Sequence, residues 1–124
     1  MGSGQGAVMR VMVTGSRLWT NVEIITNELA ALSPTAVIHG GAPGADTIAA
    51  KWAADNGIPP IGIPAPWGYY PAHIAGPKRN GWLLDLKPDL VLAFPLKQSR
   101  GTWDAVHQAH ERGIPVEIIT RDGR

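Results

Sequence analysis

Two glycine-bearing turns contain the residue types that could bind a phosphate group. The first turn, TGSR at 14–17, follows the apolar run at 11–13, and the second, HGGAPGAD at 39–46, follows the apolar run at 36–38. A glycine turn between a strand and a helix can direct backbone N–H groups toward an anion, and the guanidinium of Arg17 could add two parallel hydrogen bonds. The two turns together indicate a ligand that contains phosphate.

The second turn allows a structural and a functional interpretation for each of its notable residues. Gly40 and Gly41 permit a positive φ or a close backbone approach, and Gly44 leaves room at the start of the next helix. These glycines could also serve the shape of the turn alone. Asp46 falls in the first turn of that helix, where a carboxylate stabilises the positive end of the helix dipole. The sequence therefore favours neither of two roles for Asp46, helix capping or a contact with a ribose.

Two later clusters add cations and hydroxyl groups at the starts of helices. KRN at 78–80 begins the predicted helix 78–86, and SRGT at 99–102 leads into the predicted helix 102–112. The second cluster offers N–H groups, hydroxyls and a guanidinium together, which makes it a better phosphate site than the Gly-Gly pair. The candidate ligand contacts are Gly15, Ser16, Arg17, Gly40, Gly41, Gly44, Asp46, Arg79, Asn80, Ser99, Arg100, Gly101 and Thr102.

Catalytic and metal-binding chemistry has weaker support in the residue pattern. Asp46 and Asp104 could form the carboxylate pair of a glycosidic cleavage, one to activate water and one to stabilise the oxocarbenium-like state. His39 could act as a general base or be a partly buried structural histidine. His107 and His110 are three residues apart on a predicted helix, but the sequence offers no third ligand nearby. Neither a metal nor another cofactor is predicted.

The candidate residues fall where short apolar runs alternate with helical patterns. Strands are predicted at 8–14, 35–39, 58–63, 89–94 and 114–118, and helices at 21–32, 45–56, 78–86 and 102–112. Thr20 or Asn21 could cap the first helix, and Gly57 and Gly113 would end the second and fourth. Apolar runs flanked by breakers are typical of buried parallel strands. The pattern predicts an α/β fold, a Rossmann-like three-layer α/β/α sandwich with about five parallel strands.

Prolines and aromatic residues concentrate after the third predicted strand. Residues 59–77 contain six prolines, which is too dense for a helix and predicts a loop. This loop would lie on the carboxyl side of the sheet, where open α/β folds bind ligands. It could form a lid or wall over the ligand, or its aromatic rings could simply pack on the domain.

The five tryptophans divide into two groups by their predicted surroundings. Trp19 and Trp67 fall in loops near strand ends, where an indole could stack on a base. Trp52, Trp82 and Trp103 fall on predicted helices, which favours core or subunit contacts.

Length and composition restrict the class of protein. With 124 residues, of which 44% are hydrophobic, the chain has about the size of one domain, which we place at 8–124 after a flexible lead or tag remnant at 1–7. A net charge of +1 argues against a strongly basic nucleic-acid tether. The absence of cysteine and of a long apolar stretch favours a cytoplasmic protein with no membrane partner.

The order of the motifs resembles that of the SLOG superfamily. VTGSR at 13–17, HGGAPGAD at 39–46, KRN at 78–80 and the segment 94–102 each follow an expected strand or begin an expected helix, and the resemblance spans about residues 9–119. This superfamily includes the DNA-processing protein A (Smf) domain and the LOG-type nucleotide phosphoribohydrolases, and the chain most resembles its small single-domain members in phages and bacteria. The resemblance implies a nucleotide or nucleotide-derived ligand at the topological switch point, an Arg-Asn pair facing the cleft, and self-association.

One departure from the hydrolase branch bears on activity. LOG-type enzymes carry Pro-Gly-Gly-x-Gly-Thr-x-x-Glu, and here Ala105 takes the place of the glutamate while Asp104 lies one residue earlier, about 100° away on a helix. Binding of the ligand as a sensor, carrier or sequestering agent is therefore the first hypothesis. A LOG-type N-glycosidase is the alternative. Single-stranded DNA binding, as in DNA-processing protein A, is the third, and the chain is less basic than that branch.

Overall fold

The computed structural model describes residues 8–120, in which strands and helices alternate along the chain. The elements are β1 (Arg10–Gly15), α1 (Val22–Leu32), β2 (Ala36–His39), α2 (Ala45–Asp55), β3 (Pro60–Gly62), α3 (Ala72–Asp85), β4 (Leu90–Phe94), α4 (Arg100–Glu111) and β5 (Val116–Ile118). The predicted lead at 1–7 lies outside the described residues, as do residues 121–124.

The strands within residues 8–120 form one parallel sheet in the order β3-β2-β1-β4-β5. The chain first adds β2 and β3 on one side of β1 and then crosses to add β4 and β5 on the other side. The direction of winding therefore reverses between β1 and β4, where Gly15 is paired with Phe94 at the carboxyl ends. The loops that follow these two strands leave the sheet side by side, as at the ligand sites of open α/β sheets.

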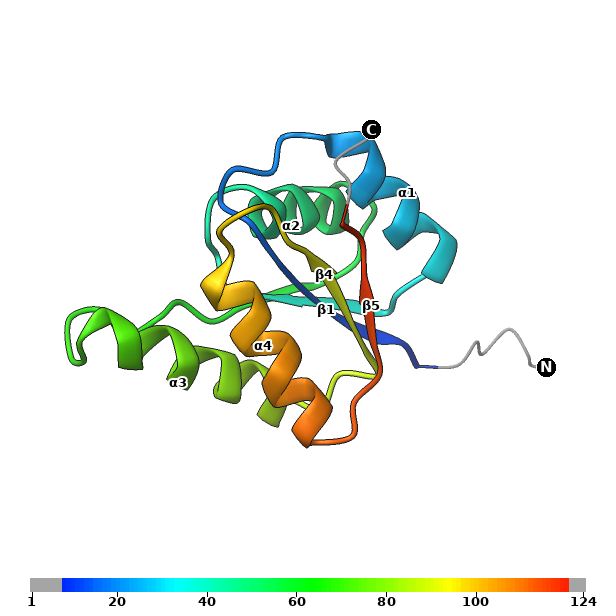
Figure 1. The fold of residues 1–124 in the computed structure, drawn as a ribbon. Helices are drawn as coiled ribbons and strands as arrows, with labels where there is room; N and C mark the ends of the chain where they lie inside the picture. The colour runs from blue at the N-terminus through cyan, green and yellow to red at the C-terminus, as the bar shows by residue number, and fades with distance from the viewer. Residues whose placement is uncertain (1–7, 121–124) are drawn as a thin grey trace.

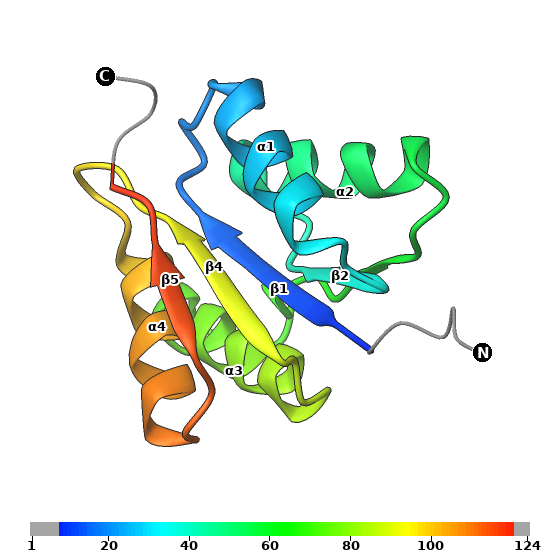
Figure 2. The same ribbon diagram turned by 90° about the vertical axis from the view of Figure 1, so that its right-hand side faces the viewer.

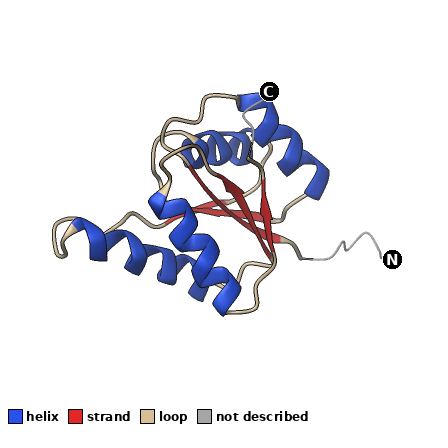
Figure 3. Ribbon diagram, viewed as in Figure 1, coloured by secondary structure: helices blue, strands red, loops and turns tan. Residues whose placement is uncertain are grey.

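Helices cover both faces of the sheet. Helices α1 and α2 lie on one face, and α3 and α4 lie on the other, with the strands between them (Figures 1 and 3). The view turned by 90° shows the same separation, with α3 and α4 together behind β4 and β5 (Figure 2). The predicted three-layer α/β/α sandwich with five parallel strands is confirmed.

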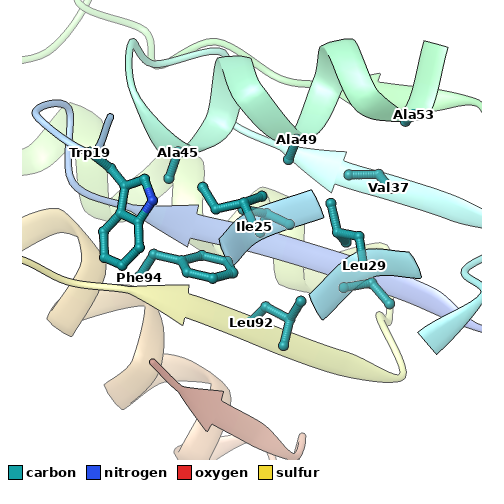
Figure 4. Close-up of a cluster of buried hydrophobic side chains, with 11 residues drawn as sticks. Trp19, Ile25, Leu29, Val37, Ala45, Ala49, Ala53, Leu92 and Phe94 are labelled. Carbon is teal, nitrogen blue, oxygen red and sulfur yellow. The ribbon is translucent and has the colours of Figure 1, made fainter. Parts of the chain in front are cut away.

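The core under α1 and α2 depends on side chains at helical spacing. Ile25 and Leu29 of α1 are four residues apart and fully buried, and Ala45, Ala49 and Ala53 repeat the same spacing on α2. Figure 4 shows these five side chains directed toward the strands. Burial of each of the two large α1 side chains stabilises the fold by about 1.5–3 kcal/mol. The small alanines let α2 approach the sheet closely.

The opposite face of the sheet presents the alternate residues of the same strands. Met12 of β1 and Ile38 of β2 pack there against Leu83 and Leu84 of α3 and Ala105 of α4. Successive side chains of a strand point to opposite faces, so each strand contributes to both cores. This explains why the strand segments are continuously apolar in the sequence.

Local sequence signals for helix ends are confirmed. Asn21 is the N-cap of α1, and its Oδ1 accepts a hydrogen bond from the backbone N–H of Ile24 at 3.2 Å. Gly57 and Gly113 follow α2 and α4 with φ of +70° and +72°, a conformation that glycine adopts at little cost.

The third helix is longer than predicted, and the loop prediction for 59–77 is wrong over its last residues. Helix α3 begins at Ala72, directly after its N-cap Pro71, and Pro77 lies inside it. Proline lacks the N–H that would complete the helical ladder, so the local sequence disfavours this helix. Gln108 of α4 donates a hydrogen bond from Nε2 to the carbonyl oxygen of Pro77 at 3.0 Å, which is one of the contacts that dock α3 on α4. Tertiary packing here overrides local propensity.

Trp19 belongs to the core, so the prediction that it could stack on a base is wrong. Only 2% of its surface is exposed, and its ring meets Phe94 edge to face with the centroids 5.3 Å apart. Its Nε1 donates to the carbonyl oxygen of Asn21 at 2.9 Å. Trp82 and Trp103 are instead exposed on α3 and α4, so neither is a core residue, and their role in subunit contacts remains a prediction.

None of the helices within residues 8–120 is long and apolar enough to span a bilayer.

The two glycine turns are packed against each other. Gly44 precedes α2 with φ of +80°, and a Cβ at this position would collide with the backbone carbonyl oxygen of Ser16. That carbonyl also accepts a hydrogen bond from the N–H of Ala45 at 3.2 Å. The start of α2 therefore lies directly on the turn that follows β1, and glycine is required there by both conformation and space.

We expect Gly44→Ala to destabilise the protein by about 3 kcal/mol or more, because it combines a strained φ with a backbone collision. Gly57→Ala is the matched control, since Gly57 has φ of +70° but no atom within 4 Å of the place that a Cβ would take. This control should cost about 1 kcal/mol. Urea unfolding of both variants measures the difference, and equal losses would show that the contact between the turns contributes little.

Candidate functional site

The candidate site lies at the edge of the sheet where β1, β2 and β4 end. The backbone N–H of Ser16 donates to the carbonyl oxygen of Phe94 at 2.9 Å, which ties the turn after β1 to the end of β4. The carbonyl oxygen of Ser16 accepts a hydrogen bond from the N–H of Ala45, which ties the same turn to α2. Ser16 is buried and its Oγ accepts from the N–H of Leu18 at 3.0 Å, so its hydroxyl shapes the turn.

The N–H groups of the adjacent glycines in the second turn are paired within the protein. The N–H of Gly40 donates to Asp46 Oδ2 at 2.7 Å, and the N–H of Gly41 donates to His39 Nδ1 at 3.0 Å. The N–H of Ser16 is likewise occupied by the end of β4. The expectation that both turns present free backbone N–H groups to an anion is therefore wrong for these three residues. The glycines of the second turn serve its shape.

Asp46 anchors the loop that follows β2. Its side chain is 4% exposed and accepts hydrogen bonds from the N–H groups of Gly40 and Ala42. The neighbouring Thr47 donates from Oγ1 to the carbonyl oxygen of Ala42 at 2.7 Å, which adds a second tie to the same loop. These contacts run back to the loop, so Asp46 has a structural role, and a ribose contact remains a prediction.

The electrostatics of Asp46 are set by opposing effects. Burial raises the pKa of Asp46 to about 6 from its ordinary value of 3.8. The hydrogen bond from Gly40 and the positive charges of Arg79 and Arg17 act in the opposite direction and recover only part of that shift. Both arginines therefore lie within electrostatic reach of one carboxylate.

Arg79 connects α3 to the end of β2. Its Nη1 donates to the carbonyl oxygen of Gly40 at 2.7 Å, and its Nε donates to Asn80 Oδ1 at 3.2 Å. A Cβ at position 40 would collide with the guanidinium, so glycine is required there for the arginine to approach. Burial first, and the charge of Arg17 in addition, lower the pKa of Arg79 from its ordinary value, while Asp46 raises it.

Asn80 joins α3 to the first turn of α4. Its buried side chain donates from Nδ2 to the carbonyl oxygen of Gly101 and to Asp104 Oδ2, both at 3.0 Å. Asp104 Oδ2 also accepts from Gln108 Nε2 at 2.8 Å. Asn80 thus positions Arg79 relative to α4, and its role as a direct ligand contact remains a prediction.

The four predicted residues at the start of α4 have different surroundings. Ser99 and Thr102 are buried, whereas Arg100 and Gly101 are exposed. Ser99 is the N-cap residue but makes no side-chain hydrogen bond to the helix, and its Oγ accepts from the N–H of Leu96 at 2.9 Å. The first turn of α4 is therefore not capped by the hydroxyl that precedes it.

His39 lies at the rim of the same site as a neutral imidazole. Burial first, and then the charge of Arg79, lower the pKa of His39 from its ordinary value of 6.5. Its Nδ1 accepts the N–H of Gly41, so the ring proton is on Nε2. The ring packs against Gly62, where a Cβ would lie 2.7 Å from Cε1. These contacts fit the structural interpretation of His39.

The two candidate catalytic carboxylates have separate partners. Asp46 is held by the loop after β2, and Asp104 is held by amide groups of α3 and α4. Gly40, Arg79 and Asn80 form a hydrogen-bonded chain that links the two carboxylates. Across the described part of the chain, no three histidine, cysteine or acidic side chains come together as a metal site would require.

The sequence predicted that these candidate residues lie near one another, but it did not predict how they are connected. The turn residues, Arg79 and Asn80 lie together at the carboxyl edge of the sheet, as predicted. The missed feature is the pairing of Asp46 with Gly40, six residues earlier, which removes one of the expected phosphate donors. An aspartate in the first turn of a helix after a glycine loop could have indicated this, because it can accept from loop N–H groups as readily as from the helix.

Comparison with known proteins identifies the family. Residues 9–70, about half of the chain, match the model of the YspA, cpYpsA-related SLOG family (YAcAr). The chain is also 38% identical over 117 residues to the Gene 61 protein of Mycobacterium phage D29, an alignment that covers 86% of this chain and 93% of the phage protein. The chain belongs to the YspA, cpYpsA-related SLOG family.

A more distant likeness exists among solved structures. The crystal structure of glycinamide ribonucleotide transformylase 1 from Symbiobacterium toebii aligns with a TM-score of 0.42 and 19% sequence identity. The alignment covers 89% of this chain and 63% of that chain, so this protein spans less than two thirds of the length of that enzyme.

We expect Asp46 to make stability depend on pH in a definite direction. Its folded pKa of about 6 exceeds the ordinary 3.8, so its protonation stabilises the fold at low pH, and this contribution is lost as the pH rises through about 6. Relative to Asp46→Asn, the free energy of unfolding of the wild type should therefore fall by up to about 3 kcal/mol between about pH 4 and pH 7. Urea unfolding across this range measures the difference.

The control for this experiment is Asp55→Asn, which also removes one negative charge from α2, but at an exposed position paired with Lys51. A carboxyl NMR titration of Asp46 with a midpoint near pH 6 would agree with the stability data. Parallel stability curves for the wild type and Asp46→Asn would contradict the assignment.

Proposed function

We propose that this chain binds a nucleotide or nucleotide-derived ligand through its phosphate groups at the edge where β1, β2 and β4 end. The observation that carries the proposal is the convergence of Arg17 and Arg79 beside a single buried carboxylate, Asp46. Membership of a SLOG family supports a nucleotide-related ligand.

The charges at the site favour an anion. Arg17 lies close enough to Arg79 to lower its pKa, in addition to the larger effect of burial. The nearby carboxylate of Asp46 balances at most one of these cations, and its own pKa is raised to about 6. Repulsion between like charges disfavours this arrangement, and a phosphate that contacts both guanidinium groups would relieve it.

The start of α4 supplies the backbone groups that the glycine turns do not. Because the side chain of Ser99 does not cap α4, the N–H groups of the first turn of this helix are suited to donate hydrogen bonds to a phosphate, and the helix dipole favours negative charge there. Asn80 donates a hydrogen bond to the carbonyl oxygen of Gly101 and accepts one from Arg79 Nε, so it holds the guanidinium next to this turn. We place the phosphate between Arg79, Arg17 and the first turn of α4.

The surroundings of Asp104 and Ala105 favour a binding role over hydrolysis. Oδ2 of Asp104 accepts hydrogen bonds from Asn80 and Gln108, so this carboxylate is used to join α3 to α4. Ala105 is fully buried in the core under α3 and α4. These contacts support a sensor, carrier or sequestering protein.

The test of binding is calorimetry against a panel of inorganic phosphate, AMP, ADP, ADP-ribose and cyclic ADP-ribose in a buffer free of phosphate and sulfate. At least one nucleotide should bind more tightly than inorganic phosphate, without release of free base on prolonged incubation. An oligo-dT gel shift at increasing salt tests single-stranded DNA binding. A panel without binding would contradict the proposal, and release of base would favour the glycosidase.

We expect Arg17→Gln to weaken binding of the best ligand by about 10- to 100-fold, the effect of losing one charge-assisted hydrogen bond. Arg17 is exposed, so the variant should fold. Arg79 also donates a hydrogen bond to Gly40, so a substitution there would change stability as well as binding. Arg112→Gln is the matched control, because Arg112 lies at the far end of α4 and pairs with Asp85. Unchanged affinity in Arg17→Gln would exclude it from the site.

A further inference from the structure

The loop between β3 and α3 carries a half-exposed tryptophan that the phosphate site does not use. The loop leaves the sheet beside the candidate site, where the N–H of Ile63 donates to the carbonyl oxygen of His39 at 3.1 Å. It then runs along α3 before turning into that helix, and both extend past α4 (Figure 1). Trp67 lies on this loop with 52% of its surface exposed.

Trp67 packs on the face of α3 that carries Arg79. Its Cη2 lies 4.0 Å from where a Cβ of Gly76 would be, so the glycine leaves room for the six-membered ring against the helix. Gly76 and Arg79 are three residues apart on α3, and residues at this spacing are neighbours on one helix face. The indole is therefore about one helical turn, roughly 5 Å along the axis, from the position of Arg79.

The loop is held in place at its end as well. Lys78 Nζ lies 4.9 Å from the centroid of the Tyr70 ring, a cation–π contact between the loop and α3. This contact and the packing of Trp67 on Gly76 fix the loop at two points. A ring that is already ordered loses little conformational entropy when a ligand stacks on it.

We propose that Trp67 is a specificity-determining residue that stacks on the base of the bound nucleotide. The inference rests on the proposed function, because the phosphate must first be held by the arginines. In the proposed arrangement the phosphate lies at Arg79 and the ribose extends along α3 toward the indole on Gly76. Stacking accepts any base, so the site would select ligands with an aromatic base over sugar phosphates without distinguishing strongly among bases.

The test compares AMP with ribose 5-phosphate, which shares the phosphate and ribose but lacks the base. In the wild type AMP should bind more tightly. Trp67→Leu keeps an apolar side chain without the aromatic face and should reduce the ratio of the two affinities by about 5- to 150-fold, with ribose 5-phosphate unaffected. Trp67→Phe retains a ring and should keep most of the preference.

Trp82→Leu is the matched control, because Trp82 is an exposed tryptophan on α3, the helix against which Trp67 packs, and 40% of its surface is exposed. Its affinity ratio should equal that of the wild type. If both ligands bind but Trp67→Leu leaves the ratio unchanged, or weakens both equally, the stacking role is overturned while the phosphate site stands. If neither ligand nor any other nucleotide binds the wild type, both proposals fail together.

Discussion

The hydrogen-bonded chain from Asp46 through Gly40 and Arg79 to Asn80 is the constraint on which the candidate site depends. Asp46 belongs to α2 on one face of the sheet, and Arg79 and Asn80 belong to α3 on the other. The chain therefore joins the two outer layers across the carboxyl edge of the sheet. A buried N–H or carbonyl group left without its partner costs about 1–3 kcal/mol, so each link holds the next in position.

This constraint separates the roles of backbone and side chains at the site. The glycines at 40 and 44 make room, the first for the guanidinium of Arg79 and the second for the turn at Ser16. The N–H groups around them are engaged within the protein. The proposed anion site therefore rests on cationic side chains and on the first turn of α4, and the glycine turns position these groups.

The sequence allowed prediction of the features that depend on local signals. The apolar strand segments, the cap at Asn21 and the stop at Gly57 each follow from a few adjacent residues. The start of α3 could not be predicted, because Pro77 disfavours a helix locally and the compensating packing comes from α4, through residues such as Gln108. The burial of Trp19 depends likewise on Phe94, a distant residue in the chain. The pairing inside the glycine turns required the folded geometry.

The docking of α4 also gives a physical reason for the alanine at position 105, which departs from the sequence pattern of the LOG-type hydrolases. Ala105, which takes the place of the hydrolase glutamate, lies at the contact of α4 with Met12 and Ile38 of the sheet. A longer, charged side chain there would have to enter a close-packed interior, which costs several kcal/mol. The adjacent Asp104 faces Asn80 and fastens α3 to α4. In this chain, the close docking of α4 thus disfavours a carboxylate at position 105, while Asp104 supports Asn80, the residue that binds Arg79.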